Sequence, residues 1–168
     1  MSASLYGSTA AQFVHGLKNL SALLEKGAAW AKENGKSEEE VLNTRLAEDM
    51  YPLARQVQIT SDMSKGAIAR LSGVAAPAME DNEVTFAELQ ERIAKTLRFI
   101  ESVDVAKLEG DESREIVVKG RNHELKFTAH SYVTVFAVPN FYFHITTAYN
   151  ILRHLGVNIG KADFIGGN

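Results

Sequence analysis

The chain has 168 residues, 45% of them hydrophobic and 23% charged, a composition typical of one globular domain spanning residues 1–168. Its net charge of -3 argues against a nucleic-acid-binding protein, because neutralising phosphates requires clustered basic residues. The absence of cysteine excludes disulfides and metal–thiolate sites and leaves the cytoplasm as the expected location. No apolar run approaches the length of about 20 residues that spans a bilayer, so we expect neither a membrane span nor a signal peptide.

The N-terminal part of the chain predicts one long helix followed by a short one. Ser8 or Thr9 can cap a first helix that runs to about Asn34, in which apolar residues recur at three- and four-residue steps. Ser37 and Glu40 then form a capping-box pattern, which predicts a short second helix. The next residues indicate a connecting loop.

Two further long helices are predicted in the middle of the chain. Pro52 suits the first turn of a helix that ends at Gly73, a residue type common after helix C-termini. Thr85 and Glu88 form another capping box, which starts an amphipathic helix that ends near Ser102.

The C-terminal third predicts a β-hairpin and a last helix. Apolar residues alternate with polar ones over residues 114–128, around a turn at residues 120–122. Residues 130–138 fit either a short helix or an extended lead-in, and Pro139 is expected to start a last helix through His154. The elements together predict an all-α fold, a bundle of four long helices with a short hairpin before the last.

A polar set lies within the predicted last helix, which is hydrophobic around most of its circumference and is therefore expected to be buried. Asn140, His144 and Thr147 follow each other at i, i+4 and i+7, which places them on one side of this helix. Buried polar side chains need partners, so this side of the helix is a candidate site.

The second long helix carries a matching polar set near one face, formed by Arg55, Gln58, Asp62 and Lys65. If the two faces meet, Gln58 and Asp62 would lie near His144 inside an otherwise apolar core. An imidazole beside a carboxylate is suited to proton transfer near neutral pH. The pattern predicts a polar pocket lined by Gln58, Asp62, Asn140, His144 and Thr147, with His144 as the candidate catalytic residue.

Both sets also have a purely structural explanation. Asp62 and Lys65 are i, i+3 neighbours and fit an exposed ion pair on a solvated face. A buried histidine that forms a structural hydrogen bond is more common than a catalytic one, which applies to His144. The chain contains no HExxH, P-loop, GxGxxG or nucleophile-elbow motif.

Three segments make the chain resemble the DinB/YfiT-like superfamily of proposed metalloenzymes, and more closely an uncharacterised branch known as a domain of unknown function. The segments are FVHGLKNLSALLEK, DMYPLARQVQITSD and PNFYFHITTAYNILRHLGVNIGKADF. The resemblance implies an up-down-down-up four-helix bundle. It also implies a divalent metal held by three histidines, one from the second long helix and two from the last at HxxxH spacing.

On this sequence those metal-ligand positions fall at or near Gln58 and on Asn140 and His144, so only one histidine remains. Amide oxygens are weak ligands for zinc or nickel, and no metal is therefore expected. If zinc, nickel or manganese does bind, the resemblance places it on His144, Gln58 and Asn140, and Asp62, one turn from Gln58 on the same helix, could add a carboxylate.

Three functions remain open from the sequence. The first is a small-molecule-binding or enzymatic pocket around His144. The second, implied by the resemblance, is a metal-dependent enzyme like the thiol-dependent transferases of the superfamily. The third is a non-catalytic interaction or structural domain that forms a homodimer. None of the three involves nucleic acid or a membrane.

Overall fold

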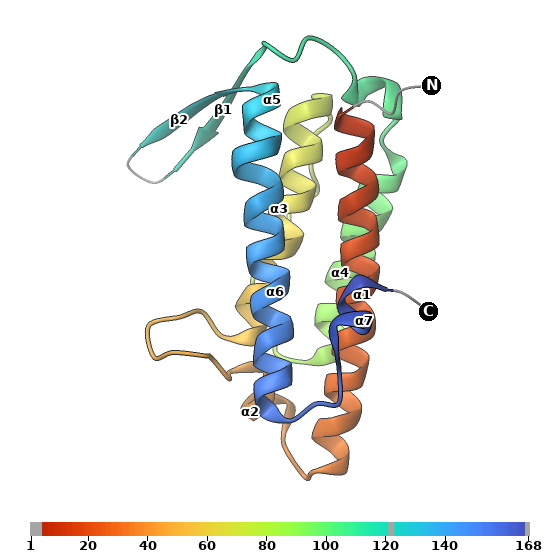
Figure 1. The fold of residues 1–168 in the computed structure, drawn as a ribbon, viewed down its shortest axis with the longest axis vertical. Coiled ribbons are helices and arrows are strands. Elements are labelled where there is room, and N and C mark those ends of the chain that lie inside the picture. Colours follow the sequence, from red (N-terminus) through yellow and green to blue (C-terminus); the bar gives the residue numbers. More distant parts are fainter. Residues whose placement is uncertain (1–4, 121–122, 167–168) are drawn as a thin grey trace.

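The computed structural model describes residues 5–120 and 123–166, and this part of the chain is mostly helical (Figure 1). Four long helices pack side by side: α1 (Leu5–Glu33), α3 (Leu53–Ser72), α4 (Phe86–Ser102) and α6 (Val138–Leu155). The shorter elements are α2 (Glu38–Leu42), η1 (Val105–Leu108), β1 (Glu115–Lys119), β2 (Glu124–Thr128), α5 (Ala129–Ser131), η2 (Tyr132–Ala137) and α7 (Lys161–Ile165). None of these described helices is both long and apolar enough to cross a membrane.

The capping residues read from the sequence set most helix ends. Ser37 caps α2 and Thr85 caps α4, each through a complete capping box, and Gly73 closes α3 with a φ of 73°. The start of α1 differs from the prediction. This helix begins at Leu5, so Ser8 and Thr9 lie inside it rather than at its cap.

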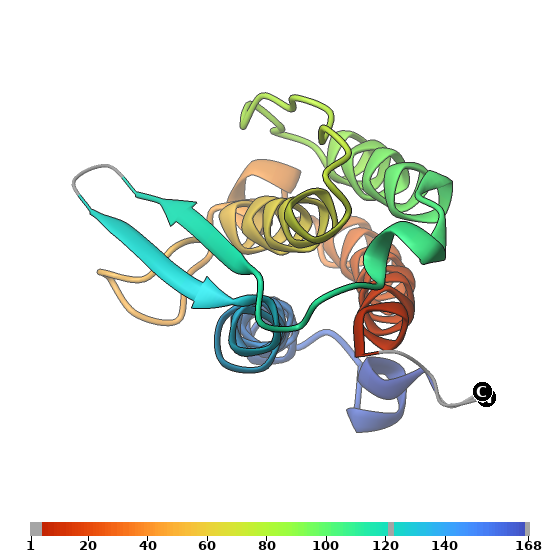
Figure 2. The same ribbon diagram turned by 90° about the horizontal axis from the view of Figure 1, so that it is seen from above.

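The predicted β-hairpin is confirmed, with β1 and β2 paired antiparallel. Glu115 lies opposite Thr128 and Lys119 opposite Glu124, while the turn residues 121–122 lie outside the described part of the chain. Ile116 is buried, and the ribbon projects away from the four long helices (Figure 2). The hairpin is therefore anchored at one end only.

The segment before the last helix is helical from Ala129 onward, so the helical chain starts well before Pro139, where the last helix was predicted to begin. Proline has no backbone N–H and cannot form the regular bond to the residue four positions earlier. The N–H of Val138 donates to the carbonyl of Val133, five positions back, and residues 132–137 form a π-helical turn. This turn joins α5 and α6 into one continuous helical segment.

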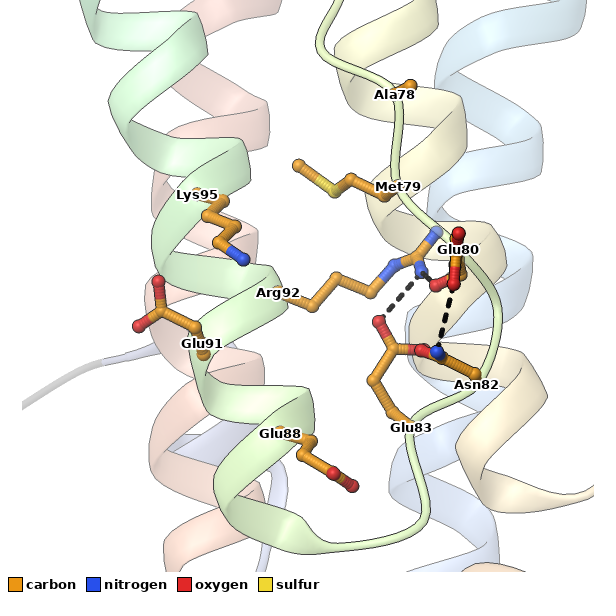
Figure 3. A pocket seen from close by; sticks show the side chains of 9 residues that line it. All are labelled: Ala78, Met79, Glu80, Asn82, Glu83, Glu88, Glu91, Arg92 and Lys95. Atoms are coloured by element: carbon orange, nitrogen blue, oxygen red, sulfur yellow. Dashed lines mark hydrogen bonds and ion pairs between the residues drawn. The ribbon is translucent and has the colours of Figure 1, made fainter.

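The segment between α3 and α4, residues 73–85, runs along these two helices without regular structure of its own (Figure 3). It places several acidic side chains beside α4. The C-terminal helix α7 is held against α1, where Asn19 donates from Nδ2 to the carbonyl of Phe164 at 3.0 Å and Lys26 pairs with Asp163 at 2.5 Å.

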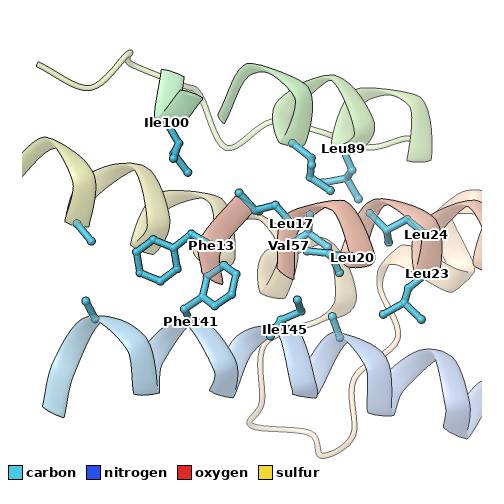
Figure 4. Packing of buried hydrophobic residues seen from close by; sticks show 14 of the residues in the cluster. Phe13, Leu17, Leu20, Leu23, Leu24, Val57, Leu89, Ile100, Phe141 and Ile145 are labelled. Carbon is cyan, nitrogen blue, oxygen red and sulfur yellow. The ribbon is translucent and has the colours of Figure 1, made fainter. Parts of the chain in front are cut away.

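The hydrophobic core lies between the four long helices (Figure 4). The rings of Phe13 on α1 and Phe141 on α6 are 4.7 Å apart and fully buried. Gly16 permits this close approach, because a Cβ at that position would lie 2.7 Å from the Phe141 ring. The core holds α6 in place, which positions its polar side chains.

Candidate functional site

His144 lies on α6, which packs closely against α3, and its side chain is half-buried. Its Nδ1 lies 2.7 Å from Oε1 of Gln56 on α3. Gln56 is only 1% exposed, so this hydrogen bond joins the two helices away from bulk solvent.

A second hydrogen bond fixes the orientation of the Gln56 amide. Its Nε2 donates to the backbone carbonyl of Tyr51 at 3.0 Å, so its Oε1 faces His144. An amide oxygen only accepts hydrogen bonds, and His144 must therefore donate from Nδ1. The neutral imidazole consequently carries its hydrogen on Nδ1 and its lone pair on Nε2.

The environment of His144 favours this neutral form. Burial lowers the pKa of the imidazole below its ordinary value, and the positive charge of Arg55 lowers it further. Within residues 5–120 and 123–166, Nε2 has no hydrogen-bond partner and is not sealed from solvent. His144 therefore presents an unoccupied lone pair at neutral pH.

Asn140 and Thr147, predicted to line the pocket, make hydrogen bonds along their own helix. Nδ2 of Asn140 donates to the carbonyl of Phe136, and Oγ1 of Thr147 donates to the carbonyl of Phe143, each at 2.7 Å. Such bonds to the preceding turn satisfy a polar side chain within a helix. These two residues share a side of α6 with His144 but do not bond to it.

Gln58 and Asp62 form their side-chain contacts with residues other than His144. Nε2 of Gln58 donates to Glu83 at 2.9 Å, and Oδ1 of Asp62 lies 2.7 Å from Arg92 and 2.5 Å from Lys65. The predicted exposed pair of Asp62 and Lys65 does form, but Lys65 is only 8% exposed and so does not lie on a solvated face.

The partner of His144 is thus Gln56 rather than Gln58. Two residues along an α-helix correspond to a rotation of about 200°, so Gln58 points to nearly the opposite side of α3. The two glutamines could not be distinguished from the sequence alone, because the polar face of α3 is broad.

Arg92 on α4 is the centre of an ionic network that sequence reasoning missed. It is 2% exposed, and one terminal nitrogen donates to the carbonyl of Glu80 at 3.0 Å and to Glu83 at 2.9 Å. The other lies 2.7 Å from Asp62 and 2.9 Å from Asp81. Figure 3 shows the side chain reaching from α4 to the 79–83 segment. Arg92 therefore fastens this segment to the helices.

The donors around His144 do not fit a transition-metal site. The Gln56 amide is committed to His144 and Tyr51, and the Asn140 amide to the turn before it. In the described residues no group of three or more histidine, cysteine, aspartate and glutamate side chains is arranged to hold a metal. A single imidazole with occupied amides is a poor donor set for zinc or nickel.

Comparison with known proteins supports the family resemblance. The family described as "Domain of unknown function (DUF1993)" matches residues 5–165. The crystal structure of a DinB family member protein from Shewanella denitrificans, at 1.83 Å resolution, is 41% identical to this chain. The match covers 98% of this chain and 93% of that one, with a TM-score of 0.89. No curated protein matches. The chain therefore belongs to the DUF1993 family and has a DinB-like fold.

Proposed function

We propose that the chain binds a small molecule at His144, whose neutral imidazole accepts a hydrogen bond or a proton through Nε2. The observation that carries this proposal is the Gln56 amide, which is held by Tyr51 at one end and by Nδ1 of His144 at the other. A fixed tautomer with a free lone pair is the arrangement that a general base requires.

The charge near His144 favours a weak acid as the ligand. The lowered pKa keeps the imidazole unprotonated at neutral pH, so it is ready to accept a proton. A ligand that donates its hydrogen toward Nε2 gains negative charge, which the positive charge of Arg55 favours. Phenols and thiols, which still carry their hydrogen at neutral pH, belong to this class.

A thermal-shift screen of small weak acids tests the proposal, with His144→Asn as the test variant. Asparagine keeps a donor near the Nδ1 position, which preserves the bond to Gln56, but it has no group equivalent to Nε2. His154→Asn removes an exposed histidine from the same helix and is the matched control. We expect an acid that stabilises the wild type and the control but not His144→Asn. No stabilisation of the wild type, or equal stabilisation of all three proteins, would contradict the proposal.

We further propose that this site works without a transition metal, in contrast to the metal-dependent transferases that the superfamily resemblance suggests. The donor chemistry around His144 supports this proposal. Elemental analysis of protein purified without a metal-affinity tag should give substoichiometric zinc, nickel and manganese. One equivalent of metal that is lost in His144→Asn would contradict it.

We infer that the four long helices form an up-down-down-up bundle. The directions of the helices in Figure 1 support this topology, with α1 and α6 descending and α3 and α4 rising. The long 73–85 segment also supports it, since two helices that run in the same direction need a connection that returns along their length.

We also propose that the chain forms a homodimer through the outer side of α6. Phe143 on α6 is 59% exposed, and Val135 in η2, which leads directly into α6, is 65% exposed, so both apolar side chains face solvent. Light scattering should give a dimer for the wild type and a monomer for Phe143→Asp. A monomeric wild type would exclude this arrangement.

A further inference from the structure

A short segment between α3 and α4, residues 79–83, lies across these two helices, and three of its five residues are acidic (Figure 3). We call it the acidic strap. None of residues 73–85, all of which the structure describes, is buried, and only Val74 and Ala76 among them pack against the hydrophobic core. Apolar burial therefore does not hold the acidic strap in place, and its polar and charged groups must do so.

Beneath the acidic strap, the interface between α3 and α4 is polar. The side chains buried there, each at most 8% exposed, are Gln58, Ser61, Lys65, Arg92 and Thr96. Arg92 makes most of its contacts with the acidic strap rather than with the helices. Its terminal nitrogens contact the carbonyl of Glu80 and the carboxylates of Asp81 and Glu83, and only the fourth acceptor, Asp62, belongs to a helix. The acidic strap therefore covers a cleft between α3 and α4 that is centred on Arg92.

The helices alone leave this cleft positively charged. Arg55 and Lys65 on α3 and Arg92 on α4 carry three positive charges. Among the described residues, Asp62 is the only carboxylate of a helix that pairs with any of the three. Without the acidic strap, the cleft would have two positive charges in excess and would attract an anion.

Asp81 and Glu83 supply the missing negative charges. Oδ1 of Asp81 lies 2.9 Å from one terminal nitrogen of Arg92, and Oε1 of Glu83 lies 2.9 Å from the other. Asp81 also pairs with Arg55, and Glu83 also accepts a hydrogen bond from Gln58 at 2.9 Å. The two carboxylates thus lie next to each other on one guanidinium, and each has a second donor. A short molecule with two carboxylates can form the same contacts.

The segment that carries the acidic strap is longer than the connection requires. Because α3 and α4 run in the same direction in the proposed bundle, it must return along the 17 residues of α4, which is about 25 Å. Residues 73–85 in extended form reach about 43 Å. A cavity of about 310 Å³ also lies between the acidic strap and α4, beside Arg92 (Figure 3). The acidic strap can therefore move off Arg92 while both helices stay in place.

We propose that the cleft between α3 and α4 binds a short dicarboxylate and that the acidic strap is an internal competitor for the same positions. The two carboxylates of the ligand replace those of Asp81 and Glu83, and the acidic strap moves aside. A monocarboxylate replaces only one of the two, so it competes poorly. The cleft is separate from the site at His144, since Gln58 and Gln56 point to nearly opposite sides of α3.

The test is an NMR titration of the wild type and of Asp81→Asn/Glu83→Gln, which removes the competing charges and keeps the side-chain sizes. The probes are glutarate, with two carboxylates, and butyrate, with one, and the Nε–H signal of Arg92 reports binding. We expect the variant to bind glutarate at least about tenfold more tightly than the wild type does, and at least about tenfold more tightly than it binds butyrate. Equal affinity in either comparison would overturn the proposal.

The methyl signal of Met79 reports the position of the acidic strap, because the sulfur of this residue lies 3.9 Å from the hydroxyls of Ser61 and Thr96. In the wild type, glutarate should shift the Met79 and Arg92 signals with the same concentration dependence. A shift of Arg92 without one of Met79 would also overturn the proposal, because the acidic strap would then stay in place while the ligand binds.

The matched control is Asp49→Asn/Glu109→Gln, which changes the net charge equally at two exposed acids elsewhere in the chain. We expect this control to bind glutarate as weakly as the wild type. Equal tightening in the control and in Asp81→Asn/Glu83→Gln would overturn the proposal, because it would reflect only the overall charge of the protein. Asp81→Asn alone, at a side chain that is 39% exposed, should give an intermediate affinity and provides the same comparison if the double variant does not fold.

Discussion

Replacing Arg92 with methionine tests how much the buried network stabilises the fold. Methionine fills much of the space of the arginine stem but leaves the surrounding carboxylates without its charge. Asp62 keeps Lys65 at 2.5 Å and Asp81 keeps Arg55, so only Glu83 loses its single cationic partner. The Glu83 side chain is 10% exposed, which makes this loss costly.

The size of the effect follows from these contacts. Removing one partner of a buried ion pair costs about 3–5 kcal/mol. Glu83 retains the hydrogen bond from Gln58 at 2.9 Å, so we expect the lower end, a loss of about 3 kcal/mol in the free energy of unfolding. Adding Glu83→Gln should then restore about 1–2 kcal/mol, because it removes the uncompensated charge.

Urea unfolding of the wild type, Arg92→Met and the double variant Arg92→Met/Glu83→Gln measures these differences. The slope of the transition should stay constant, since the same surface is exposed on unfolding. A loss below about 1 kcal/mol for Arg92→Met, or a double variant less stable than the single one, would refute the reasoning.

Three further changes have defined outcomes. The pKa of His144 is lower in the folded state than in the unfolded state. As the pH falls through about 6.5, the unfolded state therefore binds more protons than the folded state. The free energy of unfolding decreases over this range until the pH passes the folded pKa. The stability advantage of the wild type over His144→Asn, measured by thermal unfolding, should therefore shrink from pH 7.5 to pH 5, and a constant difference would contradict the lowered pKa. Gly16→Ala places a Cβ against the Phe141 ring. Urea unfolding should show a loss of about 1 kcal/mol in the free energy of unfolding, because the cost of the clash exceeds the gain in helix propensity. A stabilised variant would contradict this and would show that the Phe141 ring can shift at little cost. Thr96→Val removes the hydroxyl that lies 2.6 Å from Ser61 in the core and should cost about 1–2 kcal/mol in the same assay; no loss would mean that the Ser61 hydroxyl finds another partner.

The helix boundaries were the most predictable part of the fold, because they depend on local chemistry. The capping boxes at Ser37 and Thr85 satisfy backbone groups within four residues, so short sequence patterns identify them. The same is true of Gly73, whose positive φ few other residues adopt easily. The hairpin was predictable from alternation alone.

The π-helical turn before Pro139 could not be predicted in this way. Proline usually marks a helix start, and the sequence of residues 130–138 is compatible with several backbone conformations. Here the helix continues because Val138 donates to Val133, one residue beyond the regular spacing. Packing of residues such as Tyr132 and Val133 against the other helices decides between the alternatives.

The contacts of the candidate site residues were harder to predict than the helices that carry them. The burial of His144 followed from its apolar neighbours, but its partner depended on the rotation of α3 about its axis, which places Gln56 rather than Gln58 toward α6. The buried position of Arg92 could have been predicted from the sequence. This arginine lies between Leu89 and Ile93 on the apolar face of its helix, where a charge requires buried partners.

The most direct test of the proposed site is the protonation state of the His144 ring, measured by long-range ¹H–¹⁵N NMR at pH 7.5. The five histidines of the chain can be separated by comparison with His144→Asn, which removes only the signal of interest. We expect hydrogen on Nδ1, a bare Nε2 and a titration midpoint below about 6.5, the ordinary value for histidine. Hydrogen on Nε2, or an imidazolium at neutral pH, would contradict the fixed, neutral base on which the proposed function rests.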